Sequence, residues 1–247
     1  MNTIDTTKFP KDLGYRFPAE WEEHEATWLS WPHKEESWPD RIQLIYPAYA
    51  QFIAELTKGE KVRINVKDEV MKAFALSHIE KTEADLSQVE FYFFETNDAW
   101  CRDHGPAFLL NKNNPDNQKV IVDWGFNAWG GKYPPFENDD VIPTKIGEAF
   151  DIPVFHPGII MEGGSVEFNG KDTLLTSKSC LLNENRNPEY SQEQIEEFLR
   201  NYYGVSQILW VEDGIVGDDT DGHIDDTIRF VNEDTVLTVV EVDETDD

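Results

Sequence analysis

The sequence has few basic residues and no long hydrophobic runs. Only 21 Lys and Arg residues stand against 49 Asp and Glu residues, which gives a formal net charge of -28. Such a chain would repel nucleic acid phosphates and anionic membranes, whereas an acidic cleft in it would attract small cations. The same acidity is also typical of a surface that only promotes solubility. The charge therefore excludes some partners without identifying one.

Features of secreted and membrane-spanning proteins are also missing. No apolar run approaches the roughly 18 residues that a membrane span needs, and residues 1–12 show no basic stretch followed by an apolar one. The two cysteines, Cys101 and Cys180, are far apart, without a Cys-x-x-Cys motif or histidines at metal-ligand spacing. These absences argue against a disulfide framework or a zinc site. We expect a cytoplasmic protein with two ordinary buried thiols.

The second half of the chain contains a pattern of two strands, a helix and a strand. Residues 165–168 and 172–177 are β-rich and flank an Asn-Gly pair, which favours a tight hairpin. A capping box at Ser191 begins a helical pattern that ends at Gly204. Residues 207–211 form the next β-rich run. The order is ββαβ.

The same order can be followed one unit earlier, with strands over residues 107–110 and 120–126, a helix over 144–150 and a strand over 153–155. Further upstream, residues 40–58 have helical periodicity around Pro47, and residues 62–66 resemble a strand. We interpret this region as an incomplete first unit.

A last hairpin is predicted over residues 223–231 and 236–242, with no helix or closing strand after it. Repeated units bury their faces against their neighbours, so we expect an open apolar edge here. The sequence thus predicts an α/β fold of repeated units, formed by residues 1–247 as one domain that is incomplete at its C-terminal side.

Four polar residues occupy matching places in successive units. Asp103 lies in Cys-Arg-Asp-His-Gly-Pro, Glu162 in Met-Glu-Gly-Gly-Ser, and His223 and Asp225 in Asp-Gly-His-Ile-Asp-Asp. Taken singly, an acid beside glycine is usually a turn or cap residue. If the units are related by rotation about one axis, however, equivalent positions face that axis and the four groups converge on a pocket.

The histidine motif predicts acid–base chemistry. His223 and Asp225 are two residues apart on the predicted strand, so both side chains would point to one face. A histidine beside a carboxylate can stay protonated near neutral pH and act as an acid or a base. Asp226 would point to the opposite face.

The acidic stretch over residues 217–226 also permits a metal hypothesis, since it offers many hard oxygen ligands. However, aligning Gly222 with the glycine of an EF-hand loop puts Gly217 at the first ligand position and Ile228 at the closing glutamate position. The motif fails at both ends. A solvated acidic loop is the simpler interpretation.

Taken together, the motifs resemble those of the agmatine deiminase and bacterial-type peptidylarginine deiminase family. The similarity covers almost the whole chain and rests on five motifs in order, over residues 21–28, 97–106, 123–130, 162–165 and 220–225. The resemblance implies a five-fold pseudosymmetric α/β propeller of ββαβ modules. This chain would lack the C-terminal part of that ring.

The resemblance also implies a role for each site residue. Asp103 and Asp225 would grip a substrate guanidinium, whose planar donors suit carboxylates. His223 would transfer protons and Glu162 would support it. Trp100 would line the substrate pocket, although a buried core tryptophan is a comparable interpretation.

The implied reaction is hydrolytic deimination without a metal or organic cofactor. A cysteine thiolate attacks the guanidinium carbon, ammonia leaves, and water releases a ureido product. In the family this cysteine follows a Gly-rich segment near the C-terminus, and neither cysteine here matches it. Cys101, close to Asp103, is better interpreted as a packed thiol. We therefore expect no turnover by these residues alone.

Several alternatives remain open at this stage. The residues could form the larger part of a deiminase that works with a missing C-terminal segment, or a guanidinium-binding module without catalysis; a homo-oligomer is also open. Agmatine and peptidyl-arginine share the guanidinium, and the excess of acid without an evident basic anchor favours agmatine. Metal-dependent hydrolysis by the acidic stretch ranks behind both.

Overall fold

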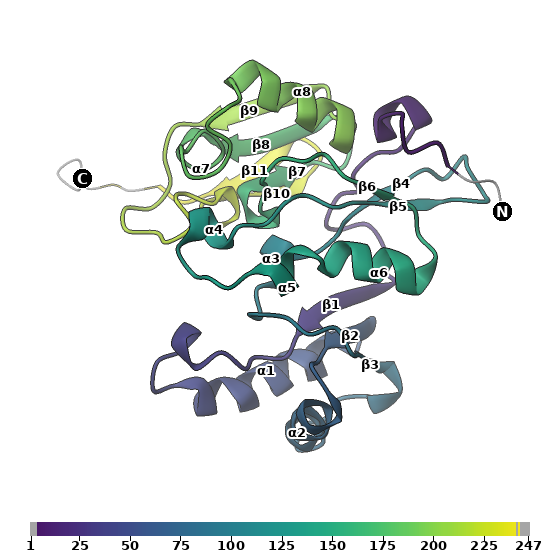
Figure 1. The fold of residues 1–247 in the computed structure, drawn as a ribbon, viewed down its shortest axis with the longest axis vertical. Helices are drawn as coiled ribbons and strands as arrows, with labels where there is room; N and C mark the ends of the chain where they lie inside the picture. The colour runs from purple at the N-terminus through teal and green to yellow at the C-terminus, as the bar shows by residue number, and fades with distance from the viewer. Residues whose placement is uncertain (1–3, 241, 243–247) are drawn as a thin grey trace. The chain divides into compact units, whose positions relative to one another are not determined.

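The computed structural model describes residues 4–240 and 242, which form two compact units, each with its own hydrophobic core. Unit 1 contains the described residues within 1–22, 102–134 and 143–247, and unit 2 contains residues 23–101 and 135–142. Both units combine helices with small sheets, which confirms the predicted mixed α/β class (Figure 1).

Unit 2 is built on a three-stranded parallel sheet. Its strands β1 (Ala26–Ser30), β2 (Lys61–Asn65) and β3 (Val89–Tyr92) lie side by side in chain order. The helices α1 (Ile42–Leu56) and α2 (Glu69–Ile79) connect them, and the short elements are η2 (Glu35–Ser37), η3 (Leu86–Gln88) and α5 (Glu137–Asp140). The core lies between this sheet and the helices, with Ile53, Val62, Ile64 and Ile79 fully buried.

The predicted helix and strand of the incomplete first unit are present as α1 and β2, within an observed order βαβαβ whose α2 and β3 were not predicted. Helix α2 escaped detection because it buries only Ala75 and Ile79, while Val70 and Phe74 are exposed. Its apolar residues therefore do not mark one face. The predicted helix around Pro47 is present as α1, which contains this proline.

Unit 1 contains both predicted ββαβ repeats. In the first, β4 (Ala107–Leu110) pairs antiparallel with β5 (Lys119–Val122), α6 (Ile142–Phe150, of which Ile142 belongs to unit 2) follows, and β6 (Val154–Phe155) pairs parallel with β5. In the second, β7 (Val166–Phe168) pairs antiparallel with β8 (Thr173–Ser177), α8 (Gln192–Tyr203) follows, and β9 (Gln207–Val211) pairs parallel with β8.

The second repeat follows its sequence signals closely. The Ser191 hydroxyl accepts from the Gln194 amide while the Gln194 side chain accepts from the Ser191 amide, so the predicted capping box is confirmed. Gly204 ends α8 in a left-handed conformation (φ 76°). Helix α8 packs on its sheet through Ile195, Leu199 and Tyr203.

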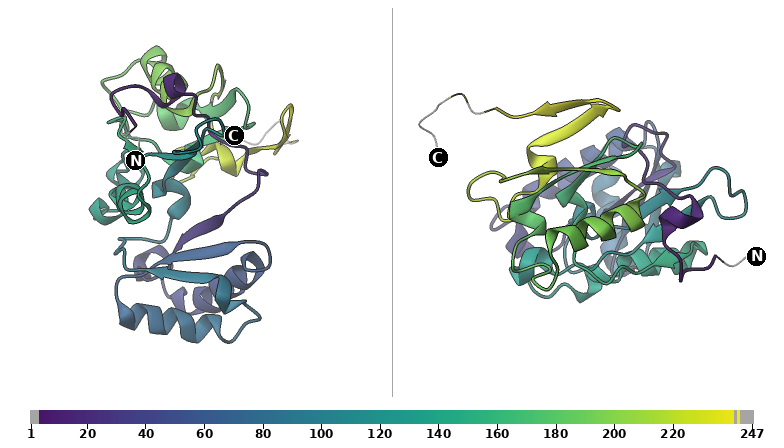
Figure 2. Two further views of the ribbon diagram at one scale, coloured as in Figure 1. Left: turned by 90° about the vertical axis from the view of Figure 1, so that its right-hand side faces the viewer. Right: turned by 90° about the horizontal axis from the view of Figure 1, so that it is seen from above.

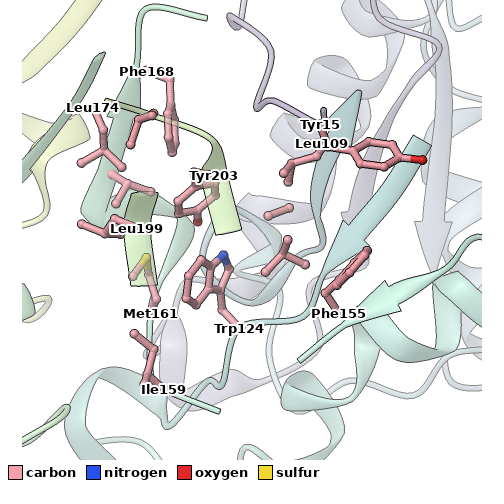
Figure 3. Packing of buried hydrophobic residues seen from close by; sticks show 14 of the residues in the cluster. Tyr15, Leu109, Trp124, Phe155, Ile159, Met161, Phe168, Leu174, Leu199 and Tyr203 are labelled. Carbon is pink, nitrogen blue, oxygen red and sulfur yellow. The ribbon is translucent and has the colours of Figure 1, made fainter. Parts of the chain in front are cut away.

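The core of unit 1 draws on both repeats. Figure 3 shows Trp124 of the first repeat next to Tyr203 of the second, in a cluster that also contains Phe155 of the first repeat and Phe168 and Leu199 of the second. The indole ring of Trp124 lies 5.0 Å from the ring of Tyr203. The two repeats therefore share one core and hold each other in place.

Short elements of unit 1 lie before, within, between and after these repeats. They are η1 (Pro10–Leu13), α3 (Cys101–His104, of which Cys101 belongs to unit 2), α4 (Ala128–Gly131), η4 (Gly163–Ser165), α7 (Lys178–Leu181) and η5 (Ile224–Asp226).

The predicted last hairpin is formed by β10 (Ile228–Asn232) and β11 (Thr235–Thr238), which pair antiparallel at the edge of unit 1 (Figure 2). Residue 241 of the predicted second strand lies outside the described residues. Leu237, Val239 and Val240 are exposed, as an open apolar edge requires. Among the described residues, no helix combines the length and the apolar character that a membrane span needs.

Replacing Gly204 should destabilise unit 1 more than replacing another left-handed glycine. A Cβ at Gly204 would lie 2.7 Å from the Tyr15 carbonyl oxygen, whereas one at Gly158 (φ 79°) would have nothing within 4 Å. We expect Gly158→Ala to cost about 1 kcal/mol of unfolding free energy and Gly204→Ala at least about 1 kcal/mol more. Urea unfolding followed by circular dichroism measures both, and equal costs would contradict the close approach.

Candidate functional site

The four residues singled out from the sequence all belong to unit 1, in turns that precede strands. Asp103 lies in α3, Glu162 is the residue before η4, His223 is the residue before η5, and Asp225 lies within η5. Asp103, Glu162 and His223 are buried, and Asp225 is half-buried. The fold therefore brings together residues that are about 60 positions apart in sequence, as a rotational repeat would.

Asp103 and His223 face each other across the Gly-Gly pair that follows Glu162. Asp103 Oδ1 lies 3.5 Å from His223 Nδ1 and accepts a hydrogen bond from the Gly164 amide at 3.1 Å. A Cβ at Gly164 would lie 2.4 Å from His223 Nδ1 and 2.7 Å from Asp103 Oδ1. Only a glycine leaves room for the aspartate and the imidazole to meet here.

Asp103 is an acid that titrates near neutral pH. Burial, followed by the nearby charges of Glu162 and Asp225, raises its pKa to about 7. Two donors oppose this shift: the Gly164 amide and the indole N–H of Trp129, which lies 3.2 Å from Asp103 Oδ2. The charge of this carboxylate therefore depends on small changes in its surroundings.

His223 does not lie on a strand, so the predicted strand face shared with Asp225 was wrong. The Asp218 carboxylate accepts hydrogen bonds from Thr220 and from the amides of Gly222 and His223, which turns the chain before η5. Strand β10 begins only at Ile228. A side chain several residues upstream thus sets the geometry, and the alternation of strand residues does not apply.

The imidazole of His223 is held neutral. Burial lowers its pKa to about 3, against the expectation that it stays protonated near neutral pH. Its Nε2 is buried and has no hydrogen-bond partner among the described residues. In this state the ring carries a single N–H proton and can accept a second proton on its other nitrogen.

Asp225 is held by an arginine of the unit itself. Its Oδ2 accepts a hydrogen bond from Arg102 Nε at 3.0 Å, and Arg102 Nη2 lies 3.7 Å from Glu167. Burial raises the pKa of Asp225, while the Arg102 charge counteracts that shift. The carboxylate is thus oriented by one guanidinium, the group that the sequence predicts it to bind in a substrate.

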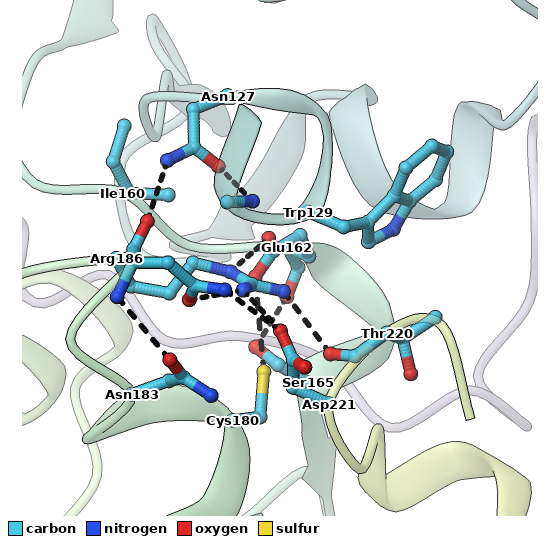
Figure 4. A network of polar contacts seen from close by, with 12 residues as sticks. Asn127, Trp129, Ile160, Glu162, Ser165, Cys180, Asn183, Arg186, Thr220 and Asp221 are labelled. Carbon is cyan, nitrogen blue, oxygen red and sulfur yellow. Dashed lines mark hydrogen bonds and ion pairs between the residues drawn. The ribbon is translucent and has the colours of Figure 1, made fainter. Parts of the chain in front are cut away.

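Glu162 is joined to Arg186, a residue that the sequence analysis missed. Arg186 Nε donates to Glu162 Oε1 at 2.6 Å, and neither side chain has exposed surface. Arg186 also donates to Asp221 at 2.7 Å and to the Thr220 carbonyl at 3.0 Å (Figure 4). One guanidinium therefore links Glu162 to the loop that leads into His223.

Three buried groups of the described residues could share a metal ion. Ligand atoms of Glu162, Cys180 and His223 all lie within 4.8 Å of one another. The Arg186 guanidinium already supplies a positive charge to this cluster through Glu162. In the acidic stretch, Asp218 accepts from backbone amides, and Asp221 is paired with Lys132 and Arg186, so both carboxylates have partners within the protein.

Trp100 and the two cysteines have their own surroundings. Trp100 and Cys101 belong to unit 2, where the Trp100 ring stacks on Trp38 at 5.5 Å and Cys101 Sγ lies 3.1 Å from the Ser30 hydroxyl. Cys180 is fully buried in unit 1, 3.9 Å from Glu162 Oε2, and burial raises the pKa of its thiol. The Cys180 thiol is therefore not activated as a nucleophile would be.

Breaking the Glu162–Arg186 pair should be costly because it leaves a buried charge without its partner. We expect Arg186→Met to lower the unfolding free energy by about 3–5 kcal/mol. The double change Glu162→Gln with Arg186→Met should cost clearly less, since no charge is then stranded. Urea unfolding measures the unfolding free energies of the single and the double variant.

The matched control is Arg200→Met, which removes a partly exposed pair with Glu196 at 2.8 Å. It should cost no more than about 1 kcal/mol. If Arg186→Met is no more damaging than this control, the buried pair does not hold the site.

Comparisons with known proteins agree on one family. Residues 16–247 match the model of the Porphyromonas-type peptidyl-arginine deiminases. The agmatine deiminase of Stutzerimonas stutzeri (strain A1501) is 36% identical, over 96% of this chain and 63% of its own length.

Solved structures are similar as well. The agmatine deiminase of Enterococcus faecalis has a TM-score of 0.87 at 32% identity, over 97% of this chain and 64% of its own. A substrate-bound agmatine deiminase of C. jejuni has a TM-score of 0.82 at 34% identity, over 94% and 66%. The chain thus spans about two thirds of the length of these relatives.

Proposed function

The chain belongs to the Porphyromonas-type peptidyl-arginine deiminase family, and from this premise we propose that its residues serve the hydrolytic deimination of a guanidinium substrate. The substrate is agmatine, which becomes N-carbamoylputrescine and ammonia. The observation that carries this proposal is the grouping of Asp103, Glu162, His223 and Asp225 in unit 1. Peptidyl-arginine is the alternative substrate.

The two aspartates are suited to binding a guanidinium. Asp103 is buried beside other acids, and a cation entering there would relieve the charge repulsion that raises its pKa. Asp225 already accepts a guanidinium hydrogen bond from Arg102 at 3.0 Å. Paired carboxylates can accept several of the planar donors of a guanidinium and hold it in one orientation.

His223 transfers the protons of the reaction, and Glu162 supports it. A thiolate adds to the guanidinium carbon, the protonated nitrogen leaves as ammonia, and water then adds to the thiouronium carbon and releases the ureido product with the thiolate. The neutral imidazole that burial favours is the form that can take a proton from that water.

Neither cysteine of these residues serves as the nucleophile. Cys180 is buried against Glu162, where a thiolate would be repelled by the carboxylate, and Cys101 packs on Ser30 in unit 2. Trp100 remains assigned to the substrate pocket by resemblance alone.

Agmatine is favoured over peptidyl-arginine by charge. The far end of agmatine is an amine, whereas that of a C-terminal arginine is a carboxylate, which the net charge of -28 would repel. The relatives described above that are named for a substrate are named agmatine deiminases.

The remaining proposals concern architecture. The two ββαβ repeats of unit 1 support a five-fold pseudosymmetric propeller in which residues 1–247 form one domain. The exposed apolar side of β11 suits a further segment of such a ring, and a homo-oligomer is a second candidate for that contact. A cytoplasmic location without nucleic acid or membrane partners is consistent with the acidity of the chain.

Binding of agmatine tests the site directly. We expect Asp103→Asn and Asp225→Asn each to weaken agmatine binding at least about tenfold, because each removes a charge-assisted hydrogen bond. Isothermal titration calorimetry at pH 8 measures the dissociation constants. The matched control is Asp226→Asn, an exposed neighbour with the same change of charge; it should alter binding less than twofold. If all three variants lose agmatine affinity equally, the loss is due to the change in net charge and the proposed site is wrong.

Turnover separates catalysis from binding alone. We expect agmatine incubated with these 247 residues to release no ammonia above a protein-free blank, since neither thiol is placed to attack. Cys101→Ala and Cys180→Ala test each thiol in turn. Ammonia release that persists in the double variant would overturn the covalent mechanism, whereas release lost only with Cys180→Ala would identify that thiol as the nucleophile.

A further inference from the structure

A strained segment of unit 1 lies against Asp103. Ala128 (φ 52°) and Trp129 (φ 56°) both adopt the left-handed conformation, and Gly130 (φ 82°) and Gly131 (φ 77°) continue it. Residues with a Cβ avoid this region, and two in succession are rare. Such backbone persists only where surrounding contacts fix it, and it is concentrated at functional sites.

Contacts at both ends fix this segment. The Asn127 carboxamide accepts from the Gly130 amide at 2.8 Å and donates to the Asn185 carbonyl at 3.0 Å. A Cβ at Gly130 would lie 2.3 Å from the Asn185 side chain, so the close approach requires glycine.

The other end of the segment is held by the loop that precedes His223. Lys132 Nζ donates to the Asp219 carbonyl and to Asp221 Oδ1, both at 2.7 Å, and the Tyr133 hydroxyl donates to Asp219 Oδ2 at 2.7 Å. Segment 127–133 is thus tied to the same loop that Arg186 holds from the other side.

The strained backbone places the Trp129 side chain against Asp103. The Trp129 indole is buried, packs edge-on against Phe126 at 5.4 Å and Tyr133 at 5.8 Å, and directs Nε1 to Asp103 Oδ2 at 3.2 Å. The Gly164 amide binds the other oxygen of the same carboxylate. The two donors fix the plane of Asp103.

We propose that Trp129 is a positioning residue for guanidinium binding: its indole N–H orients Asp103 and stabilises the ionised carboxylate that grips the substrate. This inference rests on the proposed function for its substrate, but the effect on Asp103 exists without one. A carboxylate accepts two N–H donors well, whereas a protonated carboxyl has lost part of that acceptor capacity.

The charged and titratable groups around Asp103 make this donor important. Glu162 and Asp225 raise the pKa of Asp103 by charge repulsion. His223 faces Asp103 Oδ1 as a neutral ring. The Asp103 charge also contributes to raising the pKa of the Cys180 thiol. Against burial and these acids, the Gly164 amide and the Trp129 indole lower the pKa. Losing the indole N–H would raise the pKa of Asp103 further.

The test is Trp129→Phe, which removes the N–H but keeps an aromatic ring. We expect agmatine binding to weaken about tenfold at pH 7 and to recover to within twofold of the unchanged protein at pH 9, because Asp103 ionises again at the higher pH. Calorimetry over this pH range gives the midpoint pH, at which agmatine affinity is halfway between its low-pH and high-pH values. Loss of binding to the same extent at every pH would overturn the proposal, since it would indicate a purely structural role.

The control is Trp124→Phe, the same substitution nearby, at an indole that packs on Tyr202 and Tyr203. It should leave the midpoint where it is in the unchanged protein; an equal shift would overturn the proposal. Thermal unfolding of both variants separates any loss of stability from the change in pH dependence.

A second measurement needs no substrate. The ¹³C resonance of the Asp103 carboxyl, assigned with Asp103→Asn, should titrate at a higher pH in Trp129→Phe than in the unchanged protein. An unchanged titration would overturn the inference even if agmatine binds. If agmatine does not bind at all but the titration shifts, the proposed function fails and the role of Trp129 stands.

Discussion

The site depends on the buried ion pair between Glu162 and Arg186. Both side chains are fully removed from water, so each would carry a large desolvation cost alone. Their 2.6 Å contact, together with the bonds from Arg186 to Asp221 and Thr220, offsets that cost. Arg186 therefore binds both the turn before β7 and the loop before β10, the two segments that carry Gly164 and His223.

The protonation of Asp103 and His223 depends on the groups around them. Burial raises the pKa of Asp103 to about 7 and lowers that of His223 to about 3, so both groups tend toward neutrality. A guanidinium cation beside Asp103 favours its carboxylate. The ionised Asp103, 3.5 Å from His223 Nδ1, would in turn favour a protonated imidazole. Burial alone thus favours the neutral ring, not the protonated histidine expected from the sequence.

The sequence predicted elements whose causes are local. The capping box at Ser191, the glycine stop at Gly204 and the turn at Asn169 each depend on a few neighbouring residues, and each was confirmed. Features that depend on distant partners were missed. Arg186 lies in a loop without periodicity, and only its contacts with Glu162 and Asp221 mark it. The turn at His223 depends on the Asp218 side chain, which competes with strand formation.

The repeat explains why the four site residues could still be found together. Asp103 precedes β4, Glu162 precedes β7, and His223 and Asp225 precede β10, each in a short helical turn that leads into the first strand of a hairpin. Similar turns at equivalent positions present their side chains in similar directions, so convergence is inherited from the repeated architecture. Other contacts are not repeated between the turns. Gly164 leaves room for Asp103 and His223 to meet. Arg186 neutralises Glu162, and Trp129 donates a hydrogen bond to Asp103. The repeat sets where the carboxylates lie, and these non-repeated contacts set their charge.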